Sequence, residues 1–249
     1  MVRFIFVMIY LVITLILYIP IGLMALLVGV FSPKARDGII KGVFNFAFSV
    51  IHFLSGAKVT YKGLEKIPKD CAVLYVANHA SFFDVILLSP KFPSLTGYVA
   101  KKSFSKIPLL AQAMKMTHTL FLDREDIKQG LKTILAAIEQ VKAGISMIIF
   151  PEGTRSKDGN MAEFKEGSMK ISIKSGCPIV PVAISNTAEI WENHFPKLTP
   201  VGVIIEFLDP IDPKSVDADT KKHLGKMCHD LIEEARDKNL QEIYNSGII

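Results

Sequence analysis

Two kinds of hydrophobic pattern divide the chain near residue 57. Residues 4–31 contain no charged side chain, and residues 42–56 form a second apolar segment that is rich in phenylalanine. From residue 58 onward, short apolar runs alternate with segments whose apolar side chains recur at helical spacing. We therefore predict N-terminal membrane-associated helices over 1–57 and an α/β domain over 58–249.

The first apolar segment leaves two membrane geometries open. As one helix, 4–31 would be about 42 Å long, which exceeds the roughly 30 Å of a bilayer's hydrocarbon core. Pro20 and Gly22 could kink it, so the alternatives are a tilted span or two shorter helices that enter one leaflet, with 42–56 lying at the interface. A buried core helix is a third interpretation, but core helices rarely need so long an uncharged stretch. The segment is also too long for a signal peptide and lacks a cleavage site of small residues.

The remainder of the chain has the pattern of a covered sheet. Near-continuous apolar runs indicate strands that are buried on both faces, and amphipathic segments between them indicate covering helices. Strands are predicted at 58–63, 72–78, 95–101, 118–124, 145–150, 178–184 and 201–208. Helices are predicted at 82–89, 127–144, 164–176 and 218–243. The predicted fold class is α/β, a mixed and largely buried sheet flanked by helices.

Composition narrows the class of partner. The net charge is +5 and the sequence pI is about 9.0, which suits an anionic membrane surface or a phosphorylated substrate. No dense basic run interleaved with aromatics and no zinc-finger spacing is present, so nucleic acid is not expected as a partner. The three cysteines are odd in number and widely spaced, which indicates reduced thiols and a cytosolic body.

Polar residues follow the strand at 72–78, in the stretch NHASFFD. His79 leaves the strand end, and a helix over 82–89 would bring Asp84 back toward its ring. A carboxylate there would orient the imidazole and stabilise the imidazolium, as in a general base with its orienting partner. The alternative is a His held by a backbone carbonyl, with Asp84 simply in the first turn of a helix. Ser81 could be a nucleophile, although a serine at a helix start is the commoner situation.

A second polar group follows the strand at 145–150, in the stretch FPEGTRS. Gly153 permits a tight turn with exposed N–H groups, and Arg155 could bind a phosphate or carboxylate. Lys101 and Arg124 also follow strands. Taken singly, each of these cations could equally be a solvated surface charge, and the turn could be an ordinary one.

Several catalytic signatures are absent from the sequence. It contains no GxSxG nucleophile elbow, no Walker A loop and no HExxH zinc motif. The motifs that are present resemble those of the glycerophospholipid acyltransferases. NHASFFD matches the NHxxxxD motif, FPEGTRS matches a second signature, and YVAKKSF, LFLDR, FKEGS and IVPVAI follow the family's order over roughly 58–210. The block before Arg124 lacks the glycine often found there, and Ala80 replaces a polar residue common in relatives.

The resemblance, which is strongest to bacterial 1-acyl-sn-glycerol-3-phosphate acyltransferases, implies a reaction. His79, oriented by Asp84, would deprotonate the free hydroxyl of a lysophospholipid, which would attack an acyl thioester without an acyl-enzyme and give phosphatidic acid. The co-substrate would be acyl-CoA or acyl-acyl carrier protein, and neither a cofactor nor a metal would be needed. The resemblance implies that Lys101, Arg124 and Arg155 bind the phosphate. Donors in the turn formed by Glu152, Gly153 and Thr154 would stabilise the oxyanion. Glu152 and Pro181 would shape the site.

The resemblance also implies a location and leaves alternatives. The lipid acceptor and product fit an enzyme of the cytoplasmic membrane (the inner membrane of a bacterium with two), and Lys34, Arg36 and Lys41 after the apolar segment favour a catalytic domain on the cytosolic side. One alternative is an acyltransferase of the same fold that acts on another lysophospholipid or an aminolipid. Another is a non-catalytic lipid-binding protein of the membrane.

Overall fold

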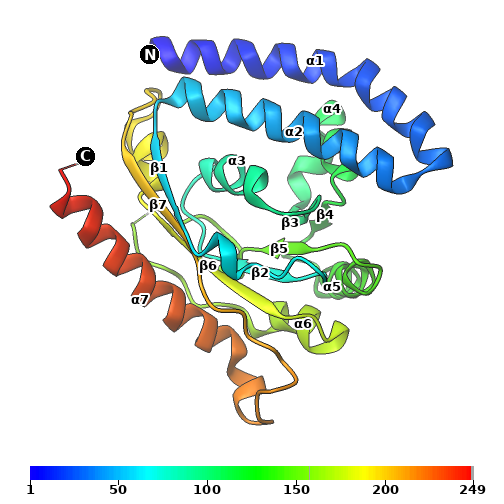
Figure 1. Cartoon of the computed structure of the whole chain (residues 1–249), viewed down its shortest axis with the longest axis vertical. Helices are drawn as coiled ribbons and strands as arrows, with labels where there is room; N and C mark the ends of the chain where they lie inside the picture. The colour runs from blue at the N-terminus through cyan, green and yellow to red at the C-terminus, as the bar shows by residue number, and fades with distance from the viewer. Residues whose placement is uncertain (157, 248–249) are drawn as a thin grey trace.

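Two long helices form an antiparallel pair along one side of the molecule (Figure 1). The computed structural model describes residues 1–156 and 158–247. Helix α1 (Val2–Phe31) is followed by Ser32, whose side chain accepts a hydrogen bond from the N–H of Ala35 and so caps α2 (Pro33–Ser55). Helix α2 ends at Gly56, where φ is +75°, the left-handed conformation that glycine adopts without strain.

Helix α1 is the outermost layer and carries an exposed apolar surface. It continues through Pro20 without a break and is curved in Figure 1, so 4–31 is one helix rather than two short ones. Both α1 and α2 are long and apolar enough to cross a membrane. Most of the large apolar side chains of α1 are exposed, and its buried residues are Val7, Tyr18, Gly22 and Ala25.

Seven strands form one mixed sheet in the order β1-β7-β6-β2-β5-β3-β4. Neighbouring strands are parallel except for β6 and β7, which are antiparallel. The strands are β1 (Lys58–Lys62), β2 (Leu74–Ala77), β3 (Gly97–Lys101), β4 (Leu120–Leu122), β5 (Met147–Ile149), β6 (Ile179–Ser185) and β7 (Gly202–Phe207). Because β6, β2 and β5 are parallel neighbours, the segments that leave their carboxyl ends meet at one edge of the sheet.

Helices cover both faces of the sheet. The remaining α-helices are α3 (Phe83–Leu88), α4 (Pro108–Met116), α5 (Ile127–Lys142), α6 (Lys170–Ser175) and α7 (Leu224–Asn245). Side chains of β2 alternate between the faces: Tyr75 packs in the cluster that includes α2 and α3, and Val76 packs in the cluster that includes α5, α6 and α7.

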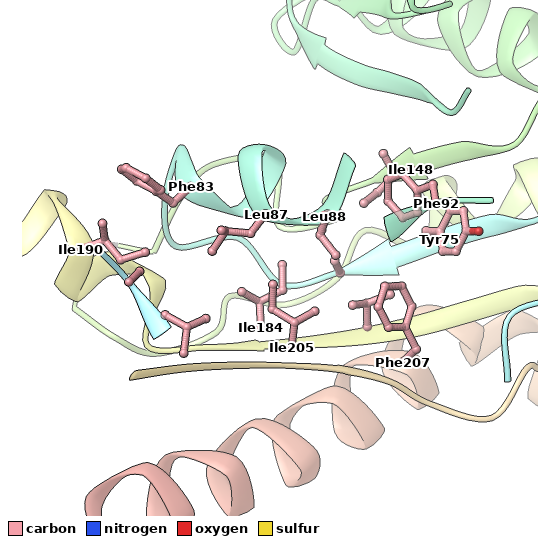
Figure 2. Close-up of a cluster of buried hydrophobic side chains, with 14 of the residues drawn as sticks. Tyr75, Phe83, Leu87, Leu88, Phe92, Ile148, Ile184, Ile190, Ile205 and Phe207 are labelled. Atoms are coloured by element: carbon pink, nitrogen blue, oxygen red, sulfur yellow. The ribbon is translucent and has the colours of Figure 1, made fainter. Parts of the chain in front are cut away.

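The short helix α3 is anchored on the sheet by its apolar side chains. Figure 2 shows Phe83, Leu87 and Leu88 of α3 lying over Ile184 and Ile205 of β6 and β7. All five side chains are almost fully buried. This packing fixes the first turn of α3, and the polar residues of that turn are held in place with it.

The predicted architecture is confirmed, with differences at particular elements. Each predicted strand overlaps an observed one, and the fold is a mixed sheet flanked by helices. The last helix begins at Leu224 rather than near 218, because Thr220–His223 forms a 3-10 turn. The predicted helix at 164–176 is a 3-10 turn, Glu166–Met169, followed by α6. Helix α4 was not predicted.

Candidate active site

His79 and Asp84 form a hydrogen-bonded pair at the carboxyl end of β2. His79 Nδ1 lies 2.7 Å from Asp84 Oδ2. Asp84 belongs to the first turn of α3, so the helix predicted at this point does bring the carboxylate back to the ring. The imidazole also stacks on Phe150, with ring centroids 4.2 Å apart, so one face of the ring is covered by the phenylalanine.

Asp84 is fully buried, and its carboxylate is the acceptor in each hydrogen bond that it makes with the described residues. Oδ2 accepts the N–H groups of Ala80 and Ser81 at 2.8 and 2.9 Å, and Oδ1 accepts the hydroxyl of Thr187 at 2.5 Å. An ionised carboxylate can only accept, so the proton of neutral His79 lies on Nδ1. His79 Nε2 is then unprotonated, and within residues 1–156 and 158–247 it makes no hydrogen bond. This is the arrangement of a general base.

Glu152 ties the loop after β5 to the loop after β2. Its Oε1 accepts the N–H of His79 at 2.7 Å, and its Oε2 accepts the N–H of Ala162 at 3.1 Å. In return, the N–H of Ser156 donates to the carbonyl of His79 at 2.9 Å. Burial raises the pKa of Glu152, and the two backbone donors oppose that shift only in part. The buried side chain of Glu152 thus fixes the backbone of His79.

Two cations lie over the turn at Gly153. The φ of Gly153 is +79°, and a Cβ built there would lie 3.1 Å from Lys165 Nζ and 3.9 Å from Arg124 Nε. Desolvation lowers the pKa of Arg124. The turn therefore carries two positive side chains on one side, which suits an anionic group.

Arg155 is a third cation of this region, and it is held by two contacts. Its NH1 donates to Glu192 Oε1 at 2.8 Å, and its guanidinium carbon lies 4.0 Å from the centroid of the Phe82 ring. Phe82 lies between His79 and Asp84 in the sequence, so Arg155 contacts the same loop as His79. The structure thus brings together His79, Asp84, Glu152 and Arg155.

Three other predicted site residues, Lys101, Thr154 and Pro181, make no side-chain hydrogen bond with this cluster among the described residues. Lys101 ends β3 with an exposed side chain and makes no ion pair with the described residues. Thr154 is exposed, and its hydroxyl has no hydrogen-bond partner in the described part of the chain. Pro181 is buried inside β6 in register with Val76, two residues short of the level of Asn78. Any effect of Pro181 on the base would pass through the backbone of the sheet.

Several residues of the site were not anticipated from sequence, and they follow β6. Thr187 and Glu192 belong to two short 3-10 turns, Thr187–Ile190 and Glu192–His194, in the stretch SNTAEIWENH. The signal that could have found them is the one used for His79 and Arg155, namely polar residues directly after a buried strand. Lys165 gave no such signal, because its position over Gly153 depends on how the loop 151–165 folds back.

Comparison with known proteins gives the family. The family model described as Acyltransferase matches residues 58–185, which is just over half of the chain. This range contains the His79–Asp84 pair, the Gly153 turn and six of the seven strands. The chain belongs to the acyltransferase family.

Individual relatives carry a more specific name. The 1-acyl-sn-glycerol-3-phosphate acyltransferase of Salmonella typhimurium is 31% identical over 205 residues, which cover 82% of each protein. The enzyme of that name from Limnanthes douglasii is 30% identical over 183 residues, and the match spans 73% of this chain but only 64% of the plant protein. The crystal structure of the 1-acyl-sn-glycerophosphate acyltransferase PlsC from Thermotoga maritima has a TM-score of 0.78 and 26% identity, covering 95% of this chain and 96% of that one.

Proposed function

We propose that this protein transfers a fatty acyl group from an acyl thioester to the sn-2 hydroxyl of 1-acyl-glycerol-3-phosphate, giving phosphatidic acid. The observation that carries the proposal is a histidine whose Nδ1 is hydrogen-bonded to a buried carboxylate and whose Nε2 has no partner among the described residues, in a site that also holds three cationic side chains. The base accounts for activation of a hydroxyl, and the cations account for a phosphate on the same acceptor. The names of the relatives support this choice of acceptor.

In the proposed reaction His79 acts first as a base and then as an acid. Nε2 takes the proton of the acceptor hydroxyl while the hydroxyl oxygen attacks the thioester carbonyl. The tetrahedral intermediate then expels the thiolate, which takes the proton from the His79 imidazolium. The Asp84 carboxylate stabilises that imidazolium throughout. The acyl group passes directly to the acceptor, and neither a metal nor another cofactor takes part.

The surroundings of Ser81 support transfer without an acyl-enzyme. Its side chain is fully buried, its hydroxyl donates to Glu192 Oε2 at 2.6 Å, and its oxygen accepts the N–H of Phe83 at 2.9 Å. A nucleophilic serine would have to donate to the base instead. The hydroxyl of Ser81 therefore serves the structure of the loop.

Donors for the oxyanion belong to the turn after β5. The N–H of Gly153 already donates to the carbonyl of Phe150 at 3.0 Å. Within the described residues, the N–H groups of Glu152 and Thr154 have no such acceptor. We assign oxyanion stabilisation to these two groups, and phosphate binding to Arg155, Arg124 and Lys165, with Lys101 as a further cation that the resemblance implies.

The proposed location follows from the N-terminal helices. We place 1–57 in the cytoplasmic membrane and 58–249 on its cytosolic side. The apolar outer face of α1 supports this assignment, as do Lys34, Arg36 and Lys41 near the start of α2. Acceptor and product are both lipids, so a catalytic domain at the membrane surface meets them without extracting them into water. Nucleic acid has no place in this scheme.

The test is an assay with detergent-purified protein, lysophosphatidic acid and radiolabelled acyl thioester. Phosphatidic acid should form, and His79→Ala should abolish its formation, with the protein's thermal unfolding midpoint (Tm) showing that the variant is folded. Parallel reactions with acyl-CoA and with acylated acyl carrier protein identify the donor. Parallel reactions with other lysophospholipids and an aminolipid test the acceptor: faster turnover of one of these would overturn the phosphate monoester assignment. No product from any acceptor would overturn acyl transfer itself.

A further inference from the structure

One carboxylate joins three loops at the edge of the sheet that carries the base. Glu192 lies after β6, and it accepts hydrogen bonds from the Ser81 hydroxyl at 2.6 Å, the Phe82 N–H at 2.9 Å and Arg155 NH1 at 2.8 Å. Ser81 and Phe82 follow β2, and Arg155 follows β5. Since β6, β2 and β5 are adjacent, Glu192 fixes the spacing of the segments that leave three neighbouring strands.

The two oxygens of Glu192 have different tasks. Oε2 holds the Ser81 hydroxyl, whereas Oε1 is shared by the Phe82 N–H and Arg155. Phe82 in turn places its ring against the Arg155 guanidinium at 4.0 Å. Glu192 therefore fixes both Arg155 itself and the aromatic surface on which Arg155 lies. The Arg155 side chain is 35% exposed, so without these two contacts it would sample many rotamers.

We propose that Glu192 is a positioning residue for acceptor binding, which holds Arg155 in the orientation that receives the acceptor's phosphate. This inference rests on the proposed function. A guanidinium has five N–H donors, and Glu192 takes one of them. The others make no hydrogen bond with the described residues, so they stay available for a bidentate contact with phosphate oxygens. Fixing the guanidinium in advance removes an ordering cost from acceptor binding.

The Arg155–Glu192 ion pair is suited to holding the guanidinium in place rather than to stabilising the fold. The side chains of Arg155 and Glu192 are 35% and 20% exposed, and ion pairs at such sites add little to folding stability. The negative charge of Glu192 also opposes an incoming phosphate, so the charge itself does not favour binding. The useful property of Glu192 is the geometry of its acceptor oxygens, and glutamine keeps one of them.

The experiment compares Glu192→Ala, Glu192→Gln and a control on the same segment, Glu189→Ala. Glu189 bonds to Asn193 and His194 at the surface and has no contact with Arg155. Glu192→Ala should raise the KM for lysophosphatidic acid roughly ten- to a hundredfold, the range for losing a hydrogen bond to a charged group. The KM for the acyl thioester and kcat should change little. Glu192→Gln should keep the acceptor KM near the wild-type value, and so should Glu189→Ala.

A second comparison separates positioning from a structural role. In an Arg155→Ala background, Glu192→Ala should raise the acceptor KM no further, because the group that it positions is gone. Equal effects of Glu192→Ala with and without Arg155 would overturn the proposal, as would an equal rise in both KM values. If Glu192→Ala does not fold, Glu192→Asp, which withdraws the carboxylate by one methylene, takes its place. A wild-type protein that makes no phosphatidic acid would instead refute the proposed function.

Discussion

Asp84 determines which nitrogen of His79 carries the proton, and it does so from a position without solvent. Three backbone or ring N–H groups converge on Oδ2, and the Thr187 hydroxyl donates to Oδ1. An asparagine could present its oxygen to the three N–H groups and its amide to Thr187. The geometry and tautomer of His79 would then survive, whereas the negative charge would not.

Asp84→Asn therefore tests the charge separately from the geometry. We expect kcat to fall by a factor on the order of 10² to 10⁴, because the imidazolium formed on proton uptake loses its counter-charge. The matched control is Thr187→Val, which removes one hydrogen bond to Asp84 but keeps the carboxylate. It should lower Tm and leave kcat within roughly threefold of wild type. Steady-state kinetics with both variants decides: similar losses of kcat would show that the charge is not what matters.

Glu152→Gln should change the pH dependence of stability. Burial raises the pKa of Glu152 above its ordinary 4.5. Between the two values the folded protein holds more protons than the unfolded chain, so this group lowers the stability of the wild type as pH rises through that window. Glutamine does not titrate. The Tm of the variant minus that of the wild type should therefore increase from about pH 4 to about pH 8.

The control for this prediction is Glu163→Gln, which neutralises a nearby carboxylate at an exposed position. Its Tm difference from wild type, measured over the same range, gives the effect of removing an exposed carboxylate from this loop. A Glu152→Gln difference that shrinks with rising pH would mean that the backbone donors outweigh burial and that the carboxylate is stabilised in the fold.

At the scale of single residues, the sequence predicted what lies close together along the chain. His79 and Asp84 are five positions apart, and the helical turn between them is a local structure. Arg155 with Glu192, and Asp84 with Thr187, join segments that follow different strands, so these contacts depend on strand order. Strand order was not predicted, and with it the role of the segment after β6 remained hidden.

Among the elements, the turn at Gly153 combines a left-handed backbone conformation with two nearby cationic side chains. Gly153→Ala would place a Cβ 3.1 Å from Lys165 Nζ at a φ of +79°. We expect a loss of stability of about 1 kcal/mol from the backbone, together with a higher KM for the acceptor, because the Lys165 ammonium group must shift. Gly159→Ala is the matched control in the same loop: its φ is +82°, but its Cβ would meet nothing within 4 Å.

Gly159→Ala should share the loss of stability and leave the acceptor KM unchanged. Denaturation and kinetics on the two purified variants separate the two effects. An acceptor KM that rises equally in both would assign the effect to loop strain, and it would remove the case for a phosphate site over the turn.

Periodicity predicted the strands and long helices, but not elements whose pattern is short. Helix α5 has a strong apolar stripe, and it ends close to the predicted Gly144. Helix α4 has nine residues and begins at Pro108. The apolar residues of that segment recur neither with period 2 nor clearly with the period of a helix. The antiparallel pairing of β6 with β7 leaves no local signature, because a strand that is buried on both faces reads the same in either direction.

For the whole molecule, the arrangement of layers determines which surface can meet a lipid. Helix α1 lies outside α2, and α2 packs on the face of the sheet that α3 also covers (Figure 1). Helix α5 packs on the opposite face. Both α1 and α5 carry exposed leucines, but those of α1 belong to a long stretch, 4–31, without a charged residue, whereas α5 carries several charged side chains. Exposed apolar residues on α1 are thus expected to contact lipid, and those on α5 to face water.

Lysine substitutions on these two helices test that expectation. In α1, Leu17 and Leu23 are 56% and 60% exposed, and in α5, Leu131 and Leu135 are 54% and 52% exposed. Leu17→Lys with Leu23→Lys should weaken liposome binding roughly ten- to a thousandfold, because each charge costs up to about 3 kcal/mol at apolar depth. Leu131→Lys with Leu135→Lys should still float with liposomes. Flotation with anionic vesicles measures both, and Tm in detergent should be similar for the two. Liposome binding that is lost in the α5 pair but kept in the α1 pair would place the membrane on the other side of the molecule.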